Sequence, residues 1–368
     1  DPFAELKKLL GRSDDQSYRY LGGAVGVVNY DAIRLVEDIP DTHNSPQPLM
    51  EFGIYDDGIL YDNLHKKLFY FYHDENRFDK LKMNGDTFGD FHSSEVTPNI
   101  NKEKFSDIVN KAKKLIHDGD IFQVVLSRKF AFEHNGDNLT LYKTLRKLNP
   151  SPYMYHLKQG SKTIIGASPE MLVRITDDKV ETFPIAGTRK ITDNEEKNKQ
   201  LADELLHDEK ELAEHTMLVD LGRNDIGRVC KYGTVHPESL MQIKRFSHVQ
   251  HIVTHVVGKL APNNDMFDAF KAVFPAGTVS GAPKVRAMEI IDELETGARG
   301  PYAGAVGYFS FNGCCDFAIA IRSIFIDGKK GFVQSGAGIV ADSVPEHEFK
   351  EIEFKAGAML QALKDATK

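Results

Sequence analysis

The stretch from residue 204 to residue 228 constrains the fold most, because its periodicity predicts a long amphipathic helix. The residues spaced by three, four and seven along one face are Leu201, Leu205, Leu212, Thr216 and Val219. Glu211 and Glu214 are three residues apart, so their carboxylates should project from neighbouring turns on nearly the same side. We expect Gly222 and the Asn224-Asp225 pair to end this helix. Taken alone, the two glutamates also fit an ordinary solvated acidic face.

The same spacing recurs near the C-terminus, where Glu348 and Glu351 lie in a second predicted helix over residues 345–363. Two such helices can bring four carboxylates together, and that much negative charge needs a cation. Oxygen ligands from carboxylates favour Mg²⁺ or a similar hard ion over zinc. The sequence therefore predicts a Mg²⁺ site between the two helices.

Length and charge limit the organisation and the partners. A chain of 368 residues can form one large domain or two. Residues 83–100 are rich in turn formers and give the best candidate linker, so we expect an N-terminal region over 1–100 and a second domain over 101–368. The net charge of −8 argues against nucleic acid as the main partner.

The cysteines and the absence of long apolar runs indicate the compartment. Cys230, Cys314 and Cys315 form no Cys-x-x-Cys pair, and the two adjacent cysteines are poor disulfide partners. No apolar run approaches about 18 residues, and no basic-then-apolar leader opens the sequence. We therefore expect a reducing, cytoplasmic location.

Periodicity predicts a chain in which helices alternate with many short strands. Further helices are predicted at the start of residues 1–20 and over 101–118, 139–148 and 285–294. Strands are predicted over residues 21–30, 121–128, 153–157, 162–166, 171–175, 179–183, 247–257, 317–321 and 332–334, with a hairpin over 58–72.

Some residues in turns and strands could carry chemistry, although each also has an ordinary explanation. Glu170 lies in a turn that leads into a strand, and the turn over residues 184–189 combines a glycine, a hydroxyl and a guanidinium. His251 lies among valines on a predicted strand, where a histidine is more often a satisfied core residue. His251 and His255 lack the glutamate that a zincin motif requires.

Two further segments could bind an anion. The glycine loop over residues 274–284 does not have the spacing of a Walker motif. Gly336-Ala337-Gly338 is predicted to form a loop whose backbone amides can donate to a carboxylate. Arg322, at the end of a predicted strand, could bind a carboxylate through two hydrogen bonds.

Long ordered strings resemble the chorismate-utilising enzymes over roughly residues 20–365, and most closely their anthranilate-forming members. The strings are Ile121-Phe-Gln-Val-Val-Leu-Ser-Arg128, Asn149-Pro-Ser-Pro-Tyr-Met154, Gly166-Ala-Ser-Pro-Glu170, Pro184-Ile-Ala-Gly-Thr-Arg189, Ala213-Glu-His215, Gly277-Thr-Val-Ser-Gly-Ala-Pro-Lys284, Arg299-Gly-Pro-Tyr-Ala-Gly-Ala-Val-Gly307 and Gly336-Ala-Gly338. The resemblance implies an α+β fold in which antiparallel β-sheets pack as a sandwich flanked by outer helices.

The resemblance also implies a reaction in tryptophan biosynthesis. Ammonia adds to chorismate at C2 while the 4-hydroxyl leaves, and pyruvate is then eliminated to give anthranilate. Glu170 matches the acid that assists departure of the hydroxyl, His251 matches the histidine of the elimination half, and Thr278 lies close by in the family.

The resemblance assigns the ligands as follows. Mg²⁺ is held mainly by Glu214 and Glu351, with Glu211 and Glu348 in support, and takes the ring carboxylate of the substrate. The residues matching the holders of the enolpyruvyl carboxylate are Arg322, Tyr302, Gly336, Ala337 and Gly338, and those lining the ring are Gly187 and Thr188.

Two positions distinguish members of the family. Gln123 stands where isochorismate and salicylate synthases carry a lysine base, and Ala186 stands where aminodeoxychorismate synthases commonly carry a lysine nucleophile. Both favour the anthranilate-forming branch. The alternatives are an aminodeoxychorismate synthase and a non-catalytic regulatory paralogue.

The resemblance finally implies an effector and a partner. Pro152, Tyr153 and Met154 match one half of a tryptophan-binding site, whereas the Leu-Leu-Glu-Ser string of the other half does not occur in the sequence and is expected upstream of Asp1. No cysteine lies in a Gly-x-Cys-x-Gly elbow, so we expect ammonia to come from a separate glutamine amidotransferase subunit in a hetero-oligomer.

Overall fold

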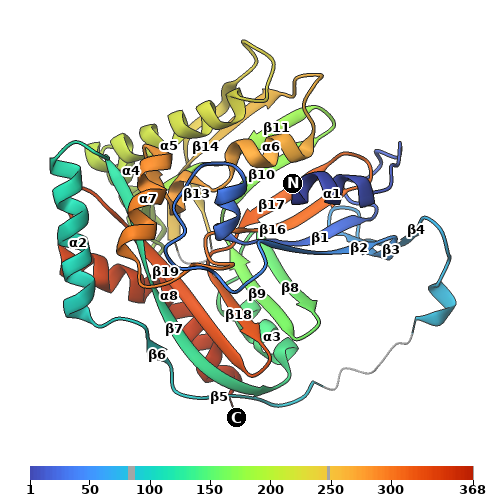
Figure 1. Cartoon of the computed structure of the whole chain (residues 1–368), viewed down its shortest axis with the longest axis horizontal. Coiled ribbons are helices and arrows are strands. Elements are labelled where there is room, and N and C mark those ends of the chain that lie inside the picture. Colours follow the sequence, from blue (N-terminus) through green and yellow to red (C-terminus); the bar gives the residue numbers. More distant parts are fainter. Residues whose placement is uncertain (82–87, 247–248, 368) are drawn as a thin grey trace.

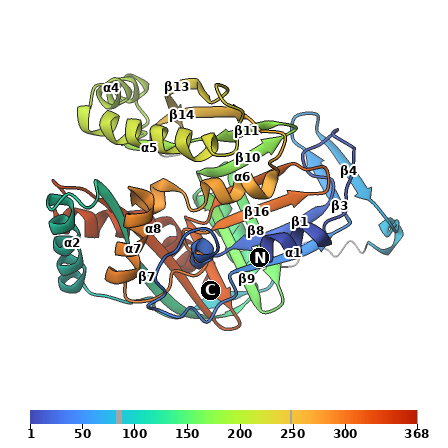
Figure 2. The same ribbon diagram turned by 45° about the horizontal axis from the view of Figure 1, so that its top comes forward.

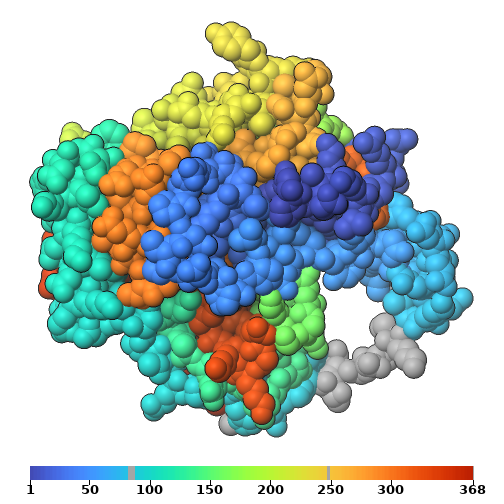
Figure 3. All heavy atoms as spheres, in the orientation of Figure 1, coloured from blue at the N-terminus to red at the C-terminus, as the bar shows by residue number. Residues whose placement is uncertain are grey.

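The computed structural model describes residues 1–81, 88–246 and 249–367, and in this part of the chain two large β-sheets carry helices on their outer sides (Figures 1 and 2). Figure 3 shows how closely the segments pack on one face, where the N-terminal segments cover the centre of the molecule. The described helices are α1 (Pro2–Leu9), α2 (Lys102–His117), α3 (Asn138–Leu148), α4 (Glu195–Leu206), α5 (Glu209–Gly227), α6 (Met266–Val273), α7 (Lys284–Leu294) and α8 (Pro345–Ala366), with short 3₁₀ helices η1 (Tyr30–Leu35), η2 (Phe78–Lys80) and η3 (Gly277–Val279).

The first sheet, as far as the chain is described, has nine strands. Their order is β12 (Ile185–Lys190), β14 (Val249–Lys259), β11 (Lys179–Thr182), β10 (Met171–Thr176), β17 (Cys315–Ile319), β16 (Ala305–Ser310), β1 (Gly23–Val28) and β2 (Met50–Tyr55), and β13 (His236–Arg245) pairs with β14. The second sheet has the order β15 (Gly281–Ala282), β7 (Gln123–Gly136), β19 (Lys330–Ile339), β18 (Ser323–Asp327), β9 (Lys162–Ser168) and β8 (Tyr153–Gln159), with β5 (Phe91–Ser93) and β6 (Thr97–Pro98) paired to β7. Strands β3 (Asp57–Asp62) and β4 (Lys67–Tyr72) form a separate hairpin.

The register given for these strand pairs is antiparallel throughout, with β1 against β16 and β7 against β19 as examples. Together with the outer helices, this confirms the predicted class of antiparallel sheets flanked by helices. None of the helices in the described residues is long and apolar enough to cross a membrane.

An aromatic cluster joins the first sheet to the helix above it. Phe309 on β16 and Phe317 on β17 have ring centroids 4.6 Å apart, and Phe270 on α6 lies 5.6 Å and 4.8 Å from them. All three rings are fully buried. Burial of several large rings in one place contributes strongly to the hydrophobic stabilisation of this sheet.

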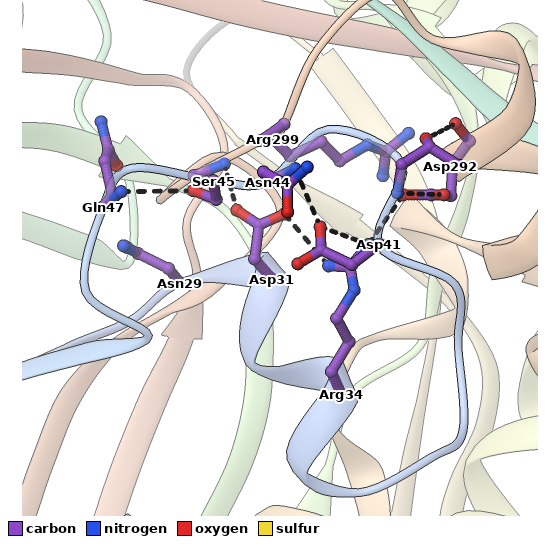
Figure 4. A network of polar contacts seen from close by, with 12 residues as sticks. Asn29, Asp31, Arg34, Asp41, Asn44, Ser45, Gln47, Asp292 and Arg299 are labelled. Carbon is purple, nitrogen blue, oxygen red and sulfur yellow. Dashed lines mark hydrogen bonds and ion pairs between the residues drawn. The ribbon is translucent and has the colours of Figure 1, made fainter.

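The N-terminal segment is tied to a loop near the C-terminal end of α7 (Figure 4). The Tyr30 amide donates to the carbonyl of Gly300 (2.7 Å), and the Gly300 amide donates to Asp31 Oδ2 (2.9 Å). Arg34 Nη2 donates to Asp292 Oδ1 at 2.7 Å. Residues 30–34 therefore fix the loop that follows α7, although nearly 270 residues separate them in sequence.

Most helix and strand predictions are confirmed, but the long helix is wrong as a single element. The chain breaks between α4 and α5 because Asp208 caps the second helix, its side chain accepting from the amides of Lys210 (3.1 Å) and Glu211 (3.2 Å). The expected stop at Gly222 is also wrong, since α5 continues to Gly227.

One expected loop is instead a strand, and another contains two short strands. Gly336-Ala337-Gly338 belongs to β19, where Gly336 pairs with Ser127 and Gly338 with Val125 of β7. Within the predicted linker, β5 and β6 also pair with β7. The predicted strand over 247–257 begins at Val249 in the described part, and residues 247 and 248 lie outside the described residues.

Candidate active site

One cavity of about 500 Å³ lies between α5, α8 and the facing strands of both sheets. Such a volume is typical of small-molecule sites. Its wall includes Glu170, Gly187, Thr188, Glu211, Glu214, His251, Thr278, Tyr302, Arg322, Gly336, Gly338, Glu348 and Glu351. Segments spread over about half of the chain therefore meet at one place.

Glu170 lies in the turn between β9 and β10 and is buried at the cavity wall. Burial raises the pKa of its carboxyl group to about 8, and the hydrogen bond from Thr278 only partly opposes this. Thr278 Oγ1 donates to Glu170 Oε1 at 2.8 Å. A carboxyl group held in its protonated form near neutral pH can act as a general acid.

His251 projects from β14 beside the bulge of β12. Its Nδ1 lies 2.8 Å from the carbonyl oxygen of Gly187 and 3.1 Å from Thr188 Oγ1. A carbonyl can only accept, so the Nδ1–H must donate to it, and Nε2 then carries the lone pair. Burial lowers the pKa of His251, which keeps the ring neutral. The imidazole can therefore accept a proton at Nε2.

The bulge itself explains the glycine at 187. Gly187 has φ +67°, and the pairing of β12 with β14 shifts register between Ala186 and Arg189. A Cβ at this position would lie 2.8 Å from Leu205 Cδ1, so a side chain would be strained and crowded. The bulge lets the Gly187 carbonyl point at His251.

The four predicted metal ligands face the cavity from two helices, Glu211 and Glu214 from α5 and Glu348 and Glu351 from α8. Burial raises the pKa of Glu211 and of Glu348, and the neighbouring glutamate adds to the rise in each case. Among the described residues, no three His, Cys, Asp or Glu side chains are already grouped as a metal site. The all-carboxylate donor set nevertheless fits a hard cation, which would relieve the repulsion.

These carboxylates have partners within the protein, and the partner of Glu348 is the side chain of Ser343. Arg189 Nη1 donates to Glu211 Oε1 at 3.2 Å, and Gln123 Nε2 donates to Glu214 Oε1 at 2.9 Å. Lys355 Nζ lies 2.6 Å from Glu351 Oε1. Arg189 and Lys355 therefore offset part of the negative charge of this wall, and Gln123 adds a neutral hydrogen bond.

Another part of the cavity wall, next to α8, is suited to a carboxylate. Arg322, with φ +50°, donates through Nη1 to the carbonyl of Lys355 (3.1 Å). No ion pair within 4.0 Å is recorded for Arg322 in the described ranges, so its charge is available to a ligand. Tyr302 shares this wall. The glycines of β19 keep the wall open, because a Cβ at Gly336 would lie 2.7 Å from Tyr302 Oη and one at Gly338 would lie 2.5 Å from Gln123 Nε2.

A buried ion pair joins two elements of the cavity wall. Arg299 Nη1 donates to the carbonyl of Val279 (2.7 Å), and Nη2 donates to the carbonyl of Val125 (2.7 Å) and to Glu295 Oε1 (2.7 Å). Glu295 Oε1 also accepts from the amide and the hydroxyl of Ser127, both at 2.8 Å. The pair therefore joins η3, which carries Thr278, to β7.

Four predicted site residues do not line the cavity. Ala337 is fully buried, one residue from each of the two glycines that do. Pro152, Tyr153 and Met154 lie at the start of β8, away from this wall, and Tyr153 Oη donates to Asp316 Oδ1 at 2.8 Å. Ala337 is therefore part of the packing of β19, and the other three residues lie outside the cavity, at the start of β8.

Sequence reasoning missed Lys355, whose Nζ also donates to the carbonyl of Gly336 at 3.2 Å. It lies four residues after Glu351 on α8, so helical spacing could have placed it on the same side. Gln334 was also missed; it lines the cavity, and its Nε2 donates to Ser127 Oγ at 2.8 Å.

Comparison with known proteins agrees with this geometry. The family described as chorismate binding enzyme matches residues 1–361. Anthranilate synthase component 1 of Methanothermobacter marburgensis is 49% identical over 369 residues, covering 100% of this chain and 80% of the relative. The protein of the same name from Acetivibrio thermocellus is 49% identical over 398 residues, covering 100% and 81%.

A solved structure gives the same result. Anthranilate synthase component I from Streptococcus pneumoniae superposes with a TM-score of 0.89 at 39% identity, covering 98% of this chain and 85% of that one. Because the family match spans nearly the whole sequence and the relatives are this similar, the chain belongs to the chorismate-binding enzyme family.

Proposed function

We propose that this chain is the synthase component of an anthranilate synthase, which aminates chorismate at C2 and then eliminates pyruvate. The observation that carries the proposal is the single cavity in which an acid, a base and a set of carboxylates meet. Relatives named anthranilate synthase component 1 match the full length of the chain, which supports the same activity.

Two cavity residues favour this activity over its neighbours. Gln123 and Ala186 both line the wall. Neither can act as the lysine base or the lysine nucleophile that isochorismate-forming and aminodeoxychorismate-forming enzymes carry at these positions. With neither lysine present, we assign ammonia as the nucleophile that attacks C2.

In the first half of the reaction Glu170 donates its proton to the 4-hydroxyl, so that the C4–O bond breaks and water leaves as the C2–N bond forms. The Thr278 hydroxyl, bonded to Glu170 Oε1, stabilises the carboxylate that results. In the second half His251 accepts the C2 proton at Nε2, and the C3–O bond to the enolpyruvyl group breaks. Loss of that group as pyruvate leaves the aromatic ring.

The remaining cavity residues hold the substrate. We assign the enolpyruvyl carboxylate to Arg322 and Tyr302, with the backbone at Gly336 and Gly338 leaving room for it. Gly187 and Thr188 line the ring.

We assign Mg²⁺ to Glu214 and Glu351, with Glu211 and Glu348 in support. When bound, the ion supplies positive charge for the ring carboxylate and polarises it. Its carboxylate donors come from α5 and α8, and this pairing supports the assignment.

Two further roles extend the proposal. Pro152, Tyr153 and Met154 form one half of a tryptophan-binding site, separate from the cavity. A glutamine amidotransferase subunit supplies ammonia in a hetero-oligomer, and the name "component 1" of the relatives supports a second component. The three buried cysteines are free thiols, which supports a reducing, cytoplasmic location.

The test is one incubation of the chain with chorismate, Mg²⁺ and ammonium at mildly alkaline pH. We expect anthranilate fluorescence to appear with one pyruvate released for each anthranilate. An aminated product without pyruvate would favour the aminodeoxychorismate alternative. No turnover by a folded chain under these conditions would favour the regulatory paralogue.

A further inference from the structure

A second, small cavity lies directly behind Glu170. It has a volume of about 40 Å³, is partly open to solvent, and is lined mainly by α5, by η3 and by the strands β10 and β11. Glu170, Thr278 and Leu218 line both this cavity and the large one. These three residues therefore form the wall between the two spaces.

The small cavity is large enough for a water molecule, and its lining suits one. About 10–15 Å³ of accessible space holds one water, which needs two to four polar partners. Such partners are available, because Glu170, Thr182, Asp225 and Thr278 all line the cavity. The rest of the lining is mainly apolar, and the volume excludes any molecule as large as the substrate.

The outer end of the cavity lies near solvent. Leu221, Gly222, Ala276 and Gly277 line it and are only partly buried, whereas Glu170 at the inner end is buried. Asp225 also lines it, and its Oδ2 accepts from Lys284 Nζ at 2.7 Å. The cavity thus spans the distance between the buried carboxyl group and the surface of α5 and η3.

We propose that this cavity holds a water molecule that carries protons from solvent to Glu170, on the side away from the substrate. The inference rests on the proposed function, in which Glu170 loses one proton in each turnover. That proton leaves with the 4-hydroxyl as water when the C4–O bond breaks, and the nitrogen loses a proton as the C2–N bond forms. The cavity water then protonates the Glu170 carboxylate and regains a proton from solvent at the Asp225 end, so protons and charges balance.

The main cavity cannot serve this purpose equally well while ligand is bound. A bound ring that is close enough to receive the proton of Glu170 occupies the space between that carboxyl group and the main opening. The small cavity shares only Glu170, Thr278 and Leu218 with the main cavity, so it reaches the same carboxyl group from outside the space that the substrate fills. It is the route that stays open during catalysis.

The test is to fill the cavity from its outer wall with Gly222→Val. A Cβ at Gly222 would lie 3.3 Å from Pro184 Cγ and 3.5 Å from Thr182 Cγ2, which is close contact without a severe clash. The residue lies inside α5, where valine is a better helix former than glycine, so the variant should fold. Ala276→Val fills the cavity from the η3 side and serves if the first variant does not fold.

We expect kcat with saturating ammonium to fall about tenfold or more, up to the roughly 10²–10⁴-fold that general acid catalysis contributes. The solvent deuterium isotope effect on kcat should rise, because proton delivery becomes rate-limiting, while KM for chorismate stays unchanged. Gly227→Val is the matched control, since Gly227 lies in the same helix and a Cβ there meets nothing within 4 Å.

Two results would overturn the inference. One is a folded Gly222→Val protein whose kcat and isotope effect equal those of Gly227→Val. The other is a loss that lies entirely in KM for chorismate, which would make the small cavity part of the substrate site. If the unsubstituted chain forms no anthranilate, the proposed function itself fails, and this outcome is distinct from both.

Discussion

Replacing Glu170 by glutamine should remove activity and at the same time stabilise the protein at alkaline pH. Burial raises the pKa of this carboxyl group from its ordinary value of 4.5 to about 8. Because the folded-state value lies above the unfolded-state value, its favourable contribution is complete below pH 4.5 and is lost as the pH rises through about 8. Glutamine has the same shape and cannot ionise, so Glu170→Gln avoids that loss.

The magnitude follows from the two pKa values. At pH well above 8 the full cost of the ionised group is about 5 kcal/mol, taking 1.36 kcal/mol per pKa unit. Integrating between pH 6 and pH 9 gives a loss of about 2.5 kcal/mol in the free energy of unfolding of the parent protein relative to Glu170→Gln. A single carboxyl group would thus account for a sizeable part of a typical protein's stability.

The assay is urea denaturation at pH 6, 7, 8 and 9 for both proteins, followed by circular dichroism because the sequence contains no tryptophan. Comparing the two proteins at each pH cancels the titration of all other groups to first order. Glu196→Gln, on the exposed surface of α4, is the control for loss of a carboxylate as such. Parallel pH dependences for the parent and Glu170→Gln would refute the argument, since they would show that Glu170 is ionised at no cost.

Four further outcomes are expected. Thr278→Val removes a hydrogen bond that lowers the pKa of Glu170, so the alkaline limb of the kcat–pH profile should move to higher pH. An unchanged limb would show that Thr278 does not influence the ionisation of Glu170. Glu214→Gln should weaken Mg²⁺ binding at least tenfold by calorimetry and abolish turnover with an unchanged circular dichroism spectrum, whereas unaltered binding would remove Glu214 from the metal site. His251→Met should accumulate the aminated intermediate that still carries pyruvate, as chromatography would show, and a normal yield of anthranilate would make His251 a core residue. With glutamine as sole nitrogen source and ammonium excluded, the chain alone should form no anthranilate, and robust formation would contradict the need for a second subunit.

Local sequence signals predict the bounds of elements that begin or end at capping and turn residues. Helix α2 begins after Asn101, whose side chain accepts from the Lys104 amide at 3.0 Å, and it ends at the predicted Asp118-Gly119. Strands β8 to β11 begin at the predicted residues and differ from the predicted ranges by one or two residues at their ends. Such elements are encoded within a few residues, so periodicity and turn chemistry predict them well.

Long-range contacts decided the elements that sequence reasoning missed. The amphipathic face runs without interruption through residues 201–219, so periodicity alone could not reveal the break between α4 and α5. Asp208 separates the two helices because it caps α5. Its carboxylate also accepts from Nη2 of Arg189, on strand β12, at 2.8 Å. Gly336 and Gly338 predict a loop when the sequence is considered alone. The strand needs glycine at both positions because side chains there would clash with Tyr302 and Gln123, which are distant in sequence.

Motif reasoning found most of the candidate site without its geometry. It selected residues that line one cavity from strands, turns and two helices, because the motif strings keep their order while the fold brings them together. It could not place Arg299 and Glu295, whose ion pair is buried behind the wall and contacts the backbone of Val125 and Val279. Residues of this kind act through other residues, and a sequence motif gives no sign of which backbone carbonyls they will bind.

The cavity finally holds carboxyl groups in different surroundings. The carboxyl group of Glu170 accepts a hydrogen bond from the neutral Thr278 hydroxyl, and burial keeps the group protonated. On the helices α5 and α8, Glu211 and Glu351 instead form ion pairs with Arg189 at 3.2 Å and with Lys355 at 2.6 Å. Lys355 lines the same cavity, and its charge lowers the pKa of Glu170 by less than burial raises it. Burial therefore outweighs both the Thr278 hydrogen bond and the charge of Lys355, and the acid keeps the proton that a leaving hydroxyl needs at neutral pH.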